Sequence, residues 1–204
     1  GSAIALTPET KTCDAILQAW YPGQAGGTAI ANVLFGDYNP AGRLPVTFYK
    51  STNQLPDFED YSMKGRTYRY MTEAPLFPFG HGLSYTTFQY GNASLNTPEI
   101  KDGEQVTLTI PVSNTGKYDG EEVVQIYLRR PGDKEGPSHA LRAFKRVAIA
   151  KGTTNQVTIP LSKENFEWFD TGTNTIRPIE GEYEILYGGT SELKHLKSIP
   201  VTIK

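Results

Sequence analysis

Hydrophobic and polar residues alternate through most of the second half of the chain. In residues 104–113, every second position is apolar, which places one face of a strand against a core. The apolar positions of this strand and of the similar segments that follow are Val106, Leu108, Ile110 and Val112; Val124, Ile126 and Leu128; Phe144, Val147 and Ile149; Val157, Ile159 and Leu161; Tyr183, Ile185 and Tyr187; Ile199, Val201 and Ile203. Short strands separated by turns predict an all-β, immunoglobulin-like sandwich over residues 89–204.

The first 88 residues follow a different pattern. Residues 23–35 carry apolar side chains at helical spacing and are followed by Gly36, which is typical of the end of a helix. The apolar run of residues 13–20 predicts a buried strand, and residues 43–49 predict a second strand. A strand, a glycine-rich turn, a helix and another strand form a βαβ-like unit.

This βαβ-like unit is incomplete. One helix and two or three strands cannot cover both faces of a buried sheet. We therefore expect residues 1–88 to belong to a larger α/β domain, of which this segment is the C-terminal part with a connecting loop. The predicted fold class is mixed, with an incomplete α/β segment followed by the sandwich.

Composition and charge exclude several classes of protein. Apolar residues make up 38% of the 204 residues, which excludes wholesale disorder. The net charge of −2 argues against a basic face for nucleic acid or an anionic membrane, and the apolar runs are too short to span a bilayer. Cys13, the single cysteine, cannot form an internal disulfide, and we expect it to be a buried small apolar residue.

Candidate cofactor sites are weak. The histidines are too scattered to form a metal site with the one cysteine: His81, His139 and His195. The glycine-rich stretch of residues 23–27 has the spacing of neither a dinucleotide-binding nor a phosphate-binding loop, and no lysine follows it. We expect no metal and no cofactor.

Six blocks of sequence carry a resemblance to a known family. They are YPGQAGGTAIA at residues 21–31, LFGDYNPAGRLPVT at 34–47, PFGHGLSYTTF at 78–88, VSNTG at 112–116, GEEVVQIYL at 120–128 and LRAFKRV at 141–147. In this order they resemble the C-terminal portion of glycoside hydrolase family 3, a family of β-glucosidases, β-xylosidases and related exo-acting enzymes. The stretch GRTYRY at residues 65–70 leans toward the xylosidase-like members.

The resemblance implies an architecture and an activity. Members have a β/α barrel, an α/β sandwich and often a fibronectin type III-like domain. On this basis residues 1–88 are the end of the α/β sandwich domain, and residues 89–204 are the fibronectin type III-like domain. The implied activity is hydrolysis of β-glucosides or β-xylosides with retention, in a periplasmic or secreted rather than cytoplasmic location.

No catalytic residue can be assigned within the chain. Retaining glycosidases use two carboxylic acids about 5 Å apart. The resemblance implies a nucleophilic aspartate in a Ser-Asp-Trp context on the barrel and a glutamate upstream of the matched blocks, and this chain contains no Ser-Asp dipeptide. Asp57, Glu59 and Asp60 are interpreted as a solvated loop. We expect the missing N-terminal barrel and α/β domain to be the chain's partners, and the fragment alone to be inactive.

The loop of residues 57–70 is the predicted contact with substrate. Tyr61 and Tyr68 offer flat faces for sugar rings, and Lys64 and Arg66 offer donors for hydroxyl groups of an oligosaccharide or an aryl or alkyl β-glycoside. The competing interpretation is that the aromatic residues pack between the two domains while the cations are surface groups.

A non-enzymatic function also fits part of the sequence. A β-sandwich alone suits a stand-alone fibronectin-like adhesion or carbohydrate-binding module without catalysis, because a fold does not determine a function. The βα segment of residues 13–49 argues against this alternative, since an adhesion module does not need a partial α/β layer.

Overall fold

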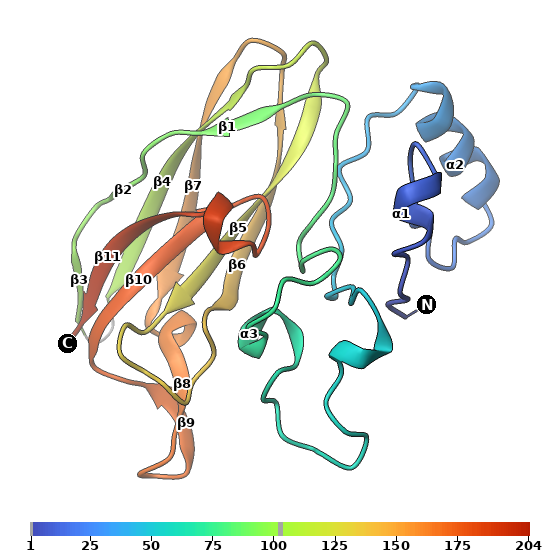
Figure 1. Ribbon diagram of the computed structural model, residues 1–204. Helices are drawn as coiled ribbons and strands as arrows, with labels where there is room; N and C mark the ends of the chain where they lie inside the picture. Colours follow the sequence, from blue (N-terminus) through green and yellow to red (C-terminus); the bar gives the residue numbers. More distant parts are fainter. Residues whose placement is uncertain (1, 102–103) are drawn as a thin grey trace.

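Two β-sheets pack face to face in the computed structural model, which describes residues 2–101 and 104–204 (Figure 1). The first sheet contains β1 (Phe88–Tyr90), β2 (Ser94–Leu95), β4 (Gln105–Asn114) and β7 (Thr154–Ser162). The second has the order β3 (Glu99–Ile100), β11 (Lys197–Ile203), β10 (Gly181–Gly188), β5 (Gly120–Arg129) and β6 (Ala140–Ile149). Paired strands are antiparallel except for β3 and β11. The predicted mixed fold class with a sandwich is confirmed.

The core of the sandwich is built from the alternating residues of the facing strands. Nearly all the predicted apolar positions are buried there. Val147 and Ile199 are partly buried against this core. Phe144 is exposed, because it has the opposite parity from Val147 and Ile149 and therefore lies on the outer face of β6. Phe166 and Trp168 close the core from η2 (Lys163–Phe166) and the hairpin of β8 (Glu167–Asp170) and β9 (Thr175–Pro178).

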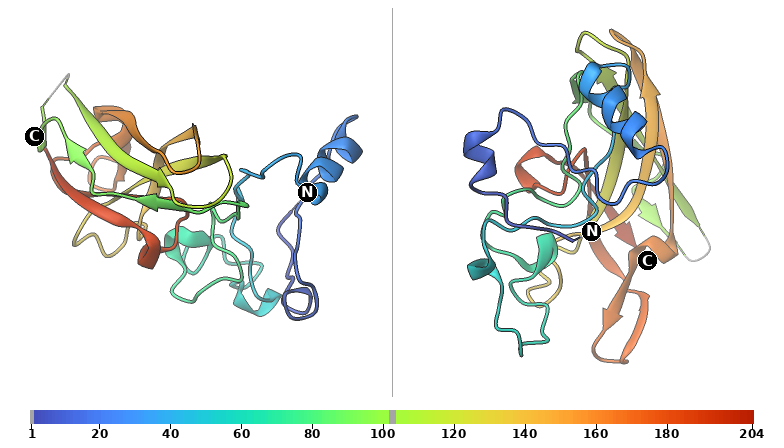
Figure 2. Two further views of the ribbon diagram at one scale, coloured as in Figure 1. Left: turned by 90° about the horizontal axis from the view of Figure 1, so that it is seen from above. Right: turned by 90° about the vertical axis from the view of Figure 1, so that its right-hand side faces the viewer.

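The N-terminal segment consists of short helices joined by irregular chain. The predicted helix is confirmed as α2 (Gly26–Phe35), and Gly36 ends it with φ 84° and an N–H that donates to the Val33 carbonyl. The remaining helices are α1 (Glu9–Thr12), η1 (Thr52–Gln54), α3 (Thr67–Tyr70) and, at the other end of the chain, η3 (Leu193–His195). The front and top views show α2 standing away from both sheets (Figures 1 and 2).

The two strands predicted in this segment are wrong. Residues 13–20 and 43–49, all of them described, form no ladder; Phe48 makes an isolated bridge with Phe77. Ile16 and Leu17 are exposed, and so is Cys13, which was expected to be buried. A strand requires a continuous hydrogen-bonded neighbour. Residues 43–49 have only separate backbone bonds, from Leu44 to residues 80–81 and from Phe48 to residues 76–77.

Strand β5 joins the N-terminal segment to the sandwich. In the middle of the strand both faces are buried, one in the sandwich core and the other against residues that include Gly80. Gln125 points away from the sandwich core, and its Nε2 donates to the carbonyls of Gly80 (3.1 Å) and Gly189 (2.7 Å). The Tyr127 hydroxyl donates to Gln125 Oε1 at 2.5 Å. Gly80 has φ 76°, and a Cβ there would collide with the Gln125 amide, so this close approach requires glycine.

A buried ion pair also connects the N-terminal segment to β5, at what we call the junction between the segment and the sandwich. Arg43 Nη2 lies 3.1 and 3.2 Å from the two carboxylate oxygens of Glu122, and the side chains are 9% and 5% exposed. Burial raises the pKa of Glu122, and the Arg43 charge opposes that shift. The pair ties residues 41–43 to the start of β5, in a setting where a lost partner would leave an isolated buried charge.

His139 is a third residue that connects the N-terminal segment to the sandwich, after Gln125 and the Arg43–Glu122 pair. Its Nε2 lies 2.8 Å from the Ser191 carbonyl, and its ring meets Tyr68 and Tyr127 edge-on, at 5.1 Å in each case. Burial lowers the pKa of His139 to about 4, and the nearby Arg129 and Arg69 charges act in the same direction. The imidazole is therefore neutral at pH 7.

We predict that Arg43→Ala lowers the free energy of unfolding by about 3–5 kcal/mol, because Glu122 is left buried without its partner. The matched control is Arg146→Ala, which breaks the more exposed pair of Arg146 with Glu121 and should cost about 1 kcal/mol or less. Urea unfolding at pH 7 measures both. Equal losses in the two variants would contradict a buried anchor at this junction.

We also predict acid sensitivity from His139. Its folded pKa, about 4, lies below the unfolded value of about 6.5. The unfolded chain therefore takes up a proton that the folded chain does not, and the free energy of unfolding falls by up to about 3 kcal/mol as the pH drops from about 6.5 to 4. Urea unfolding between pH 7 and 4 should show a flatter dependence for His139→Gln than for the unchanged chain. An unaltered dependence in His139→Gln would rule out His139 as its source.

Candidate functional site

The loop of residues 55–66 is held by hydrogen bonds within itself. Arg66 Nε donates to the Ser62 carbonyl at 3.1 Å, and Nη2 donates to the carbonyls of Asp57 (3.2 Å) and Asp60 (2.6 Å). The carboxylate oxygens Asp57 Oδ1 and Asp60 Oδ1 accept the amides two residues ahead of them. The loop is thus preorganised by one arginine and two aspartates.

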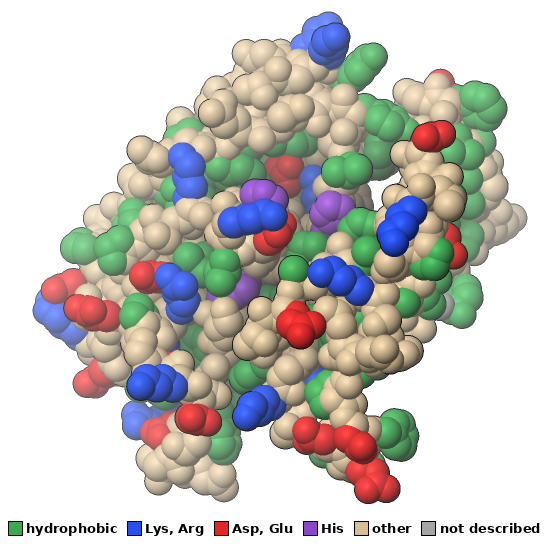
Figure 3. Space-filling model, viewed as in Figure 1, with side chains coloured by type: hydrophobic (Ala, Val, Ile, Leu, Met, Phe, Trp, Pro, Cys, Tyr) green, Lys and Arg blue, Asp and Glu red, His purple; other side chains and the backbone are tan. Residues whose placement is uncertain are grey.

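Aromatic side chains project from this loop into solvent. Phe58 and Tyr61 are each 92% exposed, and Lys64 is exposed beside them. The exposed acidic residues of the loop are Asp57, Glu59 and Asp60, and acidic side chains gather at the lower end of the face in Figure 3. A rigid loop that presents flat aromatic faces among polar groups has the chemistry of a surface for a sugar ring.

The four predicted substrate-contact residues divide into two pairs. Tyr61 and Lys64 face solvent. Arg66 uses its donors on the loop's own carbonyls, and Tyr68 turns into the junction, where its hydroxyl accepts the Leu141 N–H at 2.9 Å and its ring stacks on Phe79 at 4.8 Å. Substrate contact by these residues stays a prediction.

The sequence interpretation missed His139 as a partner of Tyr68. His139 lies 71 positions farther along the chain than Tyr68, so no local pattern links the two residues. The glycine-flanked His81 stacks on Phe77 at 5.1 Å, and His195 pairs with Glu192. His81 therefore packs within the N-terminal segment, whereas His195 pairs with a near neighbour at the surface.

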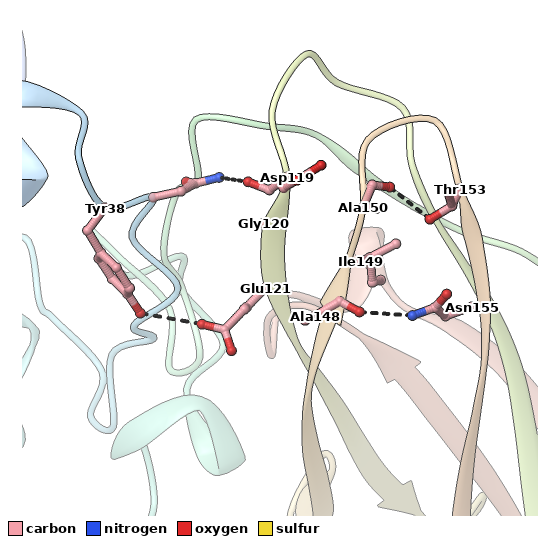
Figure 4. Close-up of a pocket in the computed structure, with 10 residues that line it drawn as sticks. Tyr38, Asp119, Gly120, Glu121, Ala148, Ile149, Ala150, Thr153 and Asn155 are labelled. Atoms are coloured by element: carbon pink, nitrogen blue, oxygen red, sulfur yellow. Dashed lines mark hydrogen bonds between the residues drawn. The ribbon is translucent and has the colours of Figure 1, made fainter.

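A separate open groove of about 580 Å³ lies between the turn after α2 and the ends of β5, β6 and β7 (Figure 4). Its polar groups bond to one another: Asn39 Nδ2 donates to the Asp119 carbonyl at 2.9 Å, and the Tyr38 hydroxyl donates to Glu121 at 3.4 Å. Asp119 Oδ1 also accepts the Lys151 N–H at 2.8 Å. The groove thus serves to tie the turn to the sandwich.

The part of the chain that the structure describes contains neither a cluster of metal ligands nor a helix that could span a membrane. Within it, no three histidine, cysteine, aspartate or glutamate side chains gather where a metal ion could be held. Within the same residues, every helix is too short or too polar to cross a membrane.

Comparison with known families divides the chain in two. Residues 1–85 match the glycosyl hydrolase family 3 C-terminal domain, and residues 122–191 match the fibronectin type III-like domain. A xylan 1,4-beta-xylosidase of Xylanibacter ruminicola is 57% identical over 203 residues, covering 100% of this chain and 23% of the relative. A periplasmic beta-glucosidase of Salmonella typhimurium is 35% identical, covering 91% of this chain and 28% of the relative.

A solved structure agrees with these matches. The β-glucosidase of Erythrobacter marinus superposes with a TM-score of 0.81 and 36% identity, covering 96% of this chain and 26% of that protein. The chain thus spans about a quarter of the length of the relatives that it matches. The sequence resemblance is confirmed: the chain belongs to glycosyl hydrolase family 3, with matches to the family's C-terminal domain and to a fibronectin type III-like domain.

Proposed function

We propose that the chain is the C-terminal structural part of an exo-acting, retaining β-glycosidase that hydrolyses β-glucosides or β-xylosides. Its catalytic carboxylates lie outside these 204 residues. The names of the relatives support both sugar classes, and the 57% identity to a xylosidase supports xylosides. The proposed boundary between the two domains lies at residue 88, where β1 begins to pair with β4.

The observation that carries the proposal is the surface of α2. This ten-residue helix contains no charged residue, yet Leu34 at its end is 68% exposed and Phe35 is also exposed. Ile16 and Leu17 add further exposed apolar area in the preceding coil. The helix has no charged face to turn toward solvent, and exposed apolar clusters mark interaction sites. The proposed covering is the remainder of the α/β domain, with the barrel beyond it.

The sandwich has a buttressing role in this proposal. The Arg43–Glu122 pair, the Gln125 amide and His139 hold the end of the α/β segment against a domain with its own core. This arrangement lets the sandwich fix the orientation of the segment. The chain's share in catalysis is therefore structural, except at the 55–66 loop.

The proposed substrate contact is made by the 55–66 loop. Tyr61 and Lys64 touch the oligosaccharide or the aryl or alkyl β-glycoside directly, with Arg66 and Tyr68 holding the loop that carries them. The exposed aromatic faces support a sugar-ring contact. A periplasmic or secreted location is proposed on the name of the Salmonella relative.

We predict that the purified chain does not hydrolyse an aryl β-glucoside or β-xyloside. Turnover should appear when the chain is mixed with the part of the Xylanibacter relative that lies outside the matched region, because the two pieces together supply the barrel, the complete α/β domain and both carboxylates. Chromogenic release from both aryl glycosides, before and after mixing, measures this.

Two variants make the mixing experiment specific to the α2 surface. Leu34→Asp should abolish the gain, because it places a charge on that surface. Ile176→Asp is the matched control: Ile176 is also 68% exposed but lies on the β8–β9 hairpin, far from α2, and the gain should persist (Figure 1). The proposal would be overturned if the chain alone hydrolysed the glycosides and a substitution within the chain abolished that hydrolysis. If the mixture bound sugar without hydrolysing it, a carbohydrate-binding module would be favoured.

A further inference from the structure

The backbone is strained at one point beside the 55–66 loop. Thr67 has φ 56°, a left-handed conformation that a β-branched residue rarely adopts. Its N–H donates to the Tyr49 hydroxyl at 2.9 Å, and the next N–H, of Tyr68, donates to Thr47 Oγ1 at 3.2 Å. Such a conformation persists only where the surrounding structure over-determines it. Thr67 is the residue between Arg66, which braces the loop, and Tyr68, which faces the sandwich.

Tyr68 is anchored to the sandwich in several ways. Its hydroxyl accepts the Leu141 N–H from β6 at 2.9 Å, and its ring stacks on Phe79 and meets Tyr127 of β5 edge-on at 5.7 Å. The backbone is held as well, since the Ser138 N–H donates to the Arg69 carbonyl at 2.7 Å. Helix α3 therefore has its position set by the connection between β5 and β6.

His139 completes this anchor with both ring nitrogens engaged. A carbonyl only accepts, so Nε2 must carry the proton that it donates to Ser191, and Nδ1 accepts from the Ser138 hydroxyl at 3.1 Å. The neutral ring is fixed in orientation by these bonds and lies against Tyr68 at 5.1 Å. His139 thereby links the loop after β10 to the aromatic side chain that ends the strained turn.

We propose that the fibronectin type III-like domain positions the 55–66 loop for substrate through Tyr68 and His139. This inference rests on the proposed function of the loop. His139 and the Leu141 N–H hold Tyr68 in place. Through the backbone of Thr67, Tyr68 sets the position of Arg66. The Arg66 guanidinium in turn donates to three carbonyls of the loop. Tyr68 and His139 are positioning residues, and the side chain that they aim is Tyr61.

Trypsin cleavage after Lys64 and Arg66 tests the positioning step on the chain as it stands. Arg66 must leave its carbonyls before it can enter a protease, so the cleavage rate reports loop opening. Tyr68→Phe removes the acceptor of the Leu141 N–H and keeps the ring; we expect cleavage about threefold to tenfold faster, as for one lost hydrogen bond. His139→Gln should act in the same direction.

Two controls separate positioning from general destabilisation. Tyr61→Phe removes the hydroxyl of an exposed side chain and should leave the rate unchanged. Cleavage after Lys151, in the turn between β6 and β7, should stay constant in every variant. The proposal would be overturned if the loop of Tyr68→Phe were cleaved as slowly as that of the unchanged chain. It would also be overturned if cleavage after Lys151 rose as much as cleavage in the loop.

Kinetics of the enzyme reconstituted from this chain and the rest of the relative test the link to substrate. Tyr61→Ala tests the proposed contact and should raise KM. Tyr68→Phe should raise KM about threefold to tenfold at unchanged kcat, whereas a merely structural role would lower the amount of active enzyme at unchanged KM.

The kinetic outcomes distinguish the two claims. If Tyr61→Ala raises KM and Tyr68→Phe does not, the positioning proposal is overturned while the substrate contact stands. If neither variant changes KM, the substrate contact itself is overturned, and trypsin cleavage still decides whether the sandwich holds the loop.

Discussion

The structure depends on the burial of polar side chains on β5, a strand whose middle is buried on both faces. Glu122 and Gln125 on this strand bond to residues far away in the sequence, and the Tyr127 hydroxyl donates to Gln125 on the same strand. A buried polar group without a partner costs the full desolvation of that group, about 1–3 kcal/mol and more for a charge. The sandwich therefore needs residues 43 and 79–80 as much as those residues need the sandwich.

This requirement divides the N-terminal segment into two parts with different stability. The part near residues 77–87 is bound by buried hydrogen bonds to the sandwich, whereas α2 and the coil before it present apolar side chains to solvent. The first part behaves as an extension of the fibronectin type III-like domain. The second resembles one side of an interface, and the proposal that the remainder of an α/β domain covers it rests on this likeness.

Much of the fold could be predicted because its signals are local. The period-two pattern locates the long strands, and helical spacing followed by Gly36 locates α2. The predicted strand at residues 13–20 is wrong because pairing is a tertiary property, which a short apolar run does not guarantee. Phe144 was assigned to the core although its parity differs from that of Val147 and Ile149.

The anchors of the candidate site leave no comparable signal. Glu122 follows Glu121, and the two look alike in sequence, yet only Glu122 is buried with Arg43. His139 meets partners 71 and 52 positions away, and Tyr68 looks as available for a ligand as Tyr61. Tyr68, unlike Tyr61, turns inward beside the strained turn at Thr67 and bonds to Leu141 of β6, and both features are consequences of the folded chain.

Native-state hydrogen exchange of the 204-residue chain is the most direct test of this account. The amides of Gly80 and Ser191, which donate to Leu44 and Phe79, should open with the same free energy as core amides of β4 and β5, because they belong to one cooperative unit. The amides of α2 should exchange much faster. Exchange of Gly80 and Ser191 at the rate of α2 would contradict the claim that the sandwich and residues 77–87 form one unit.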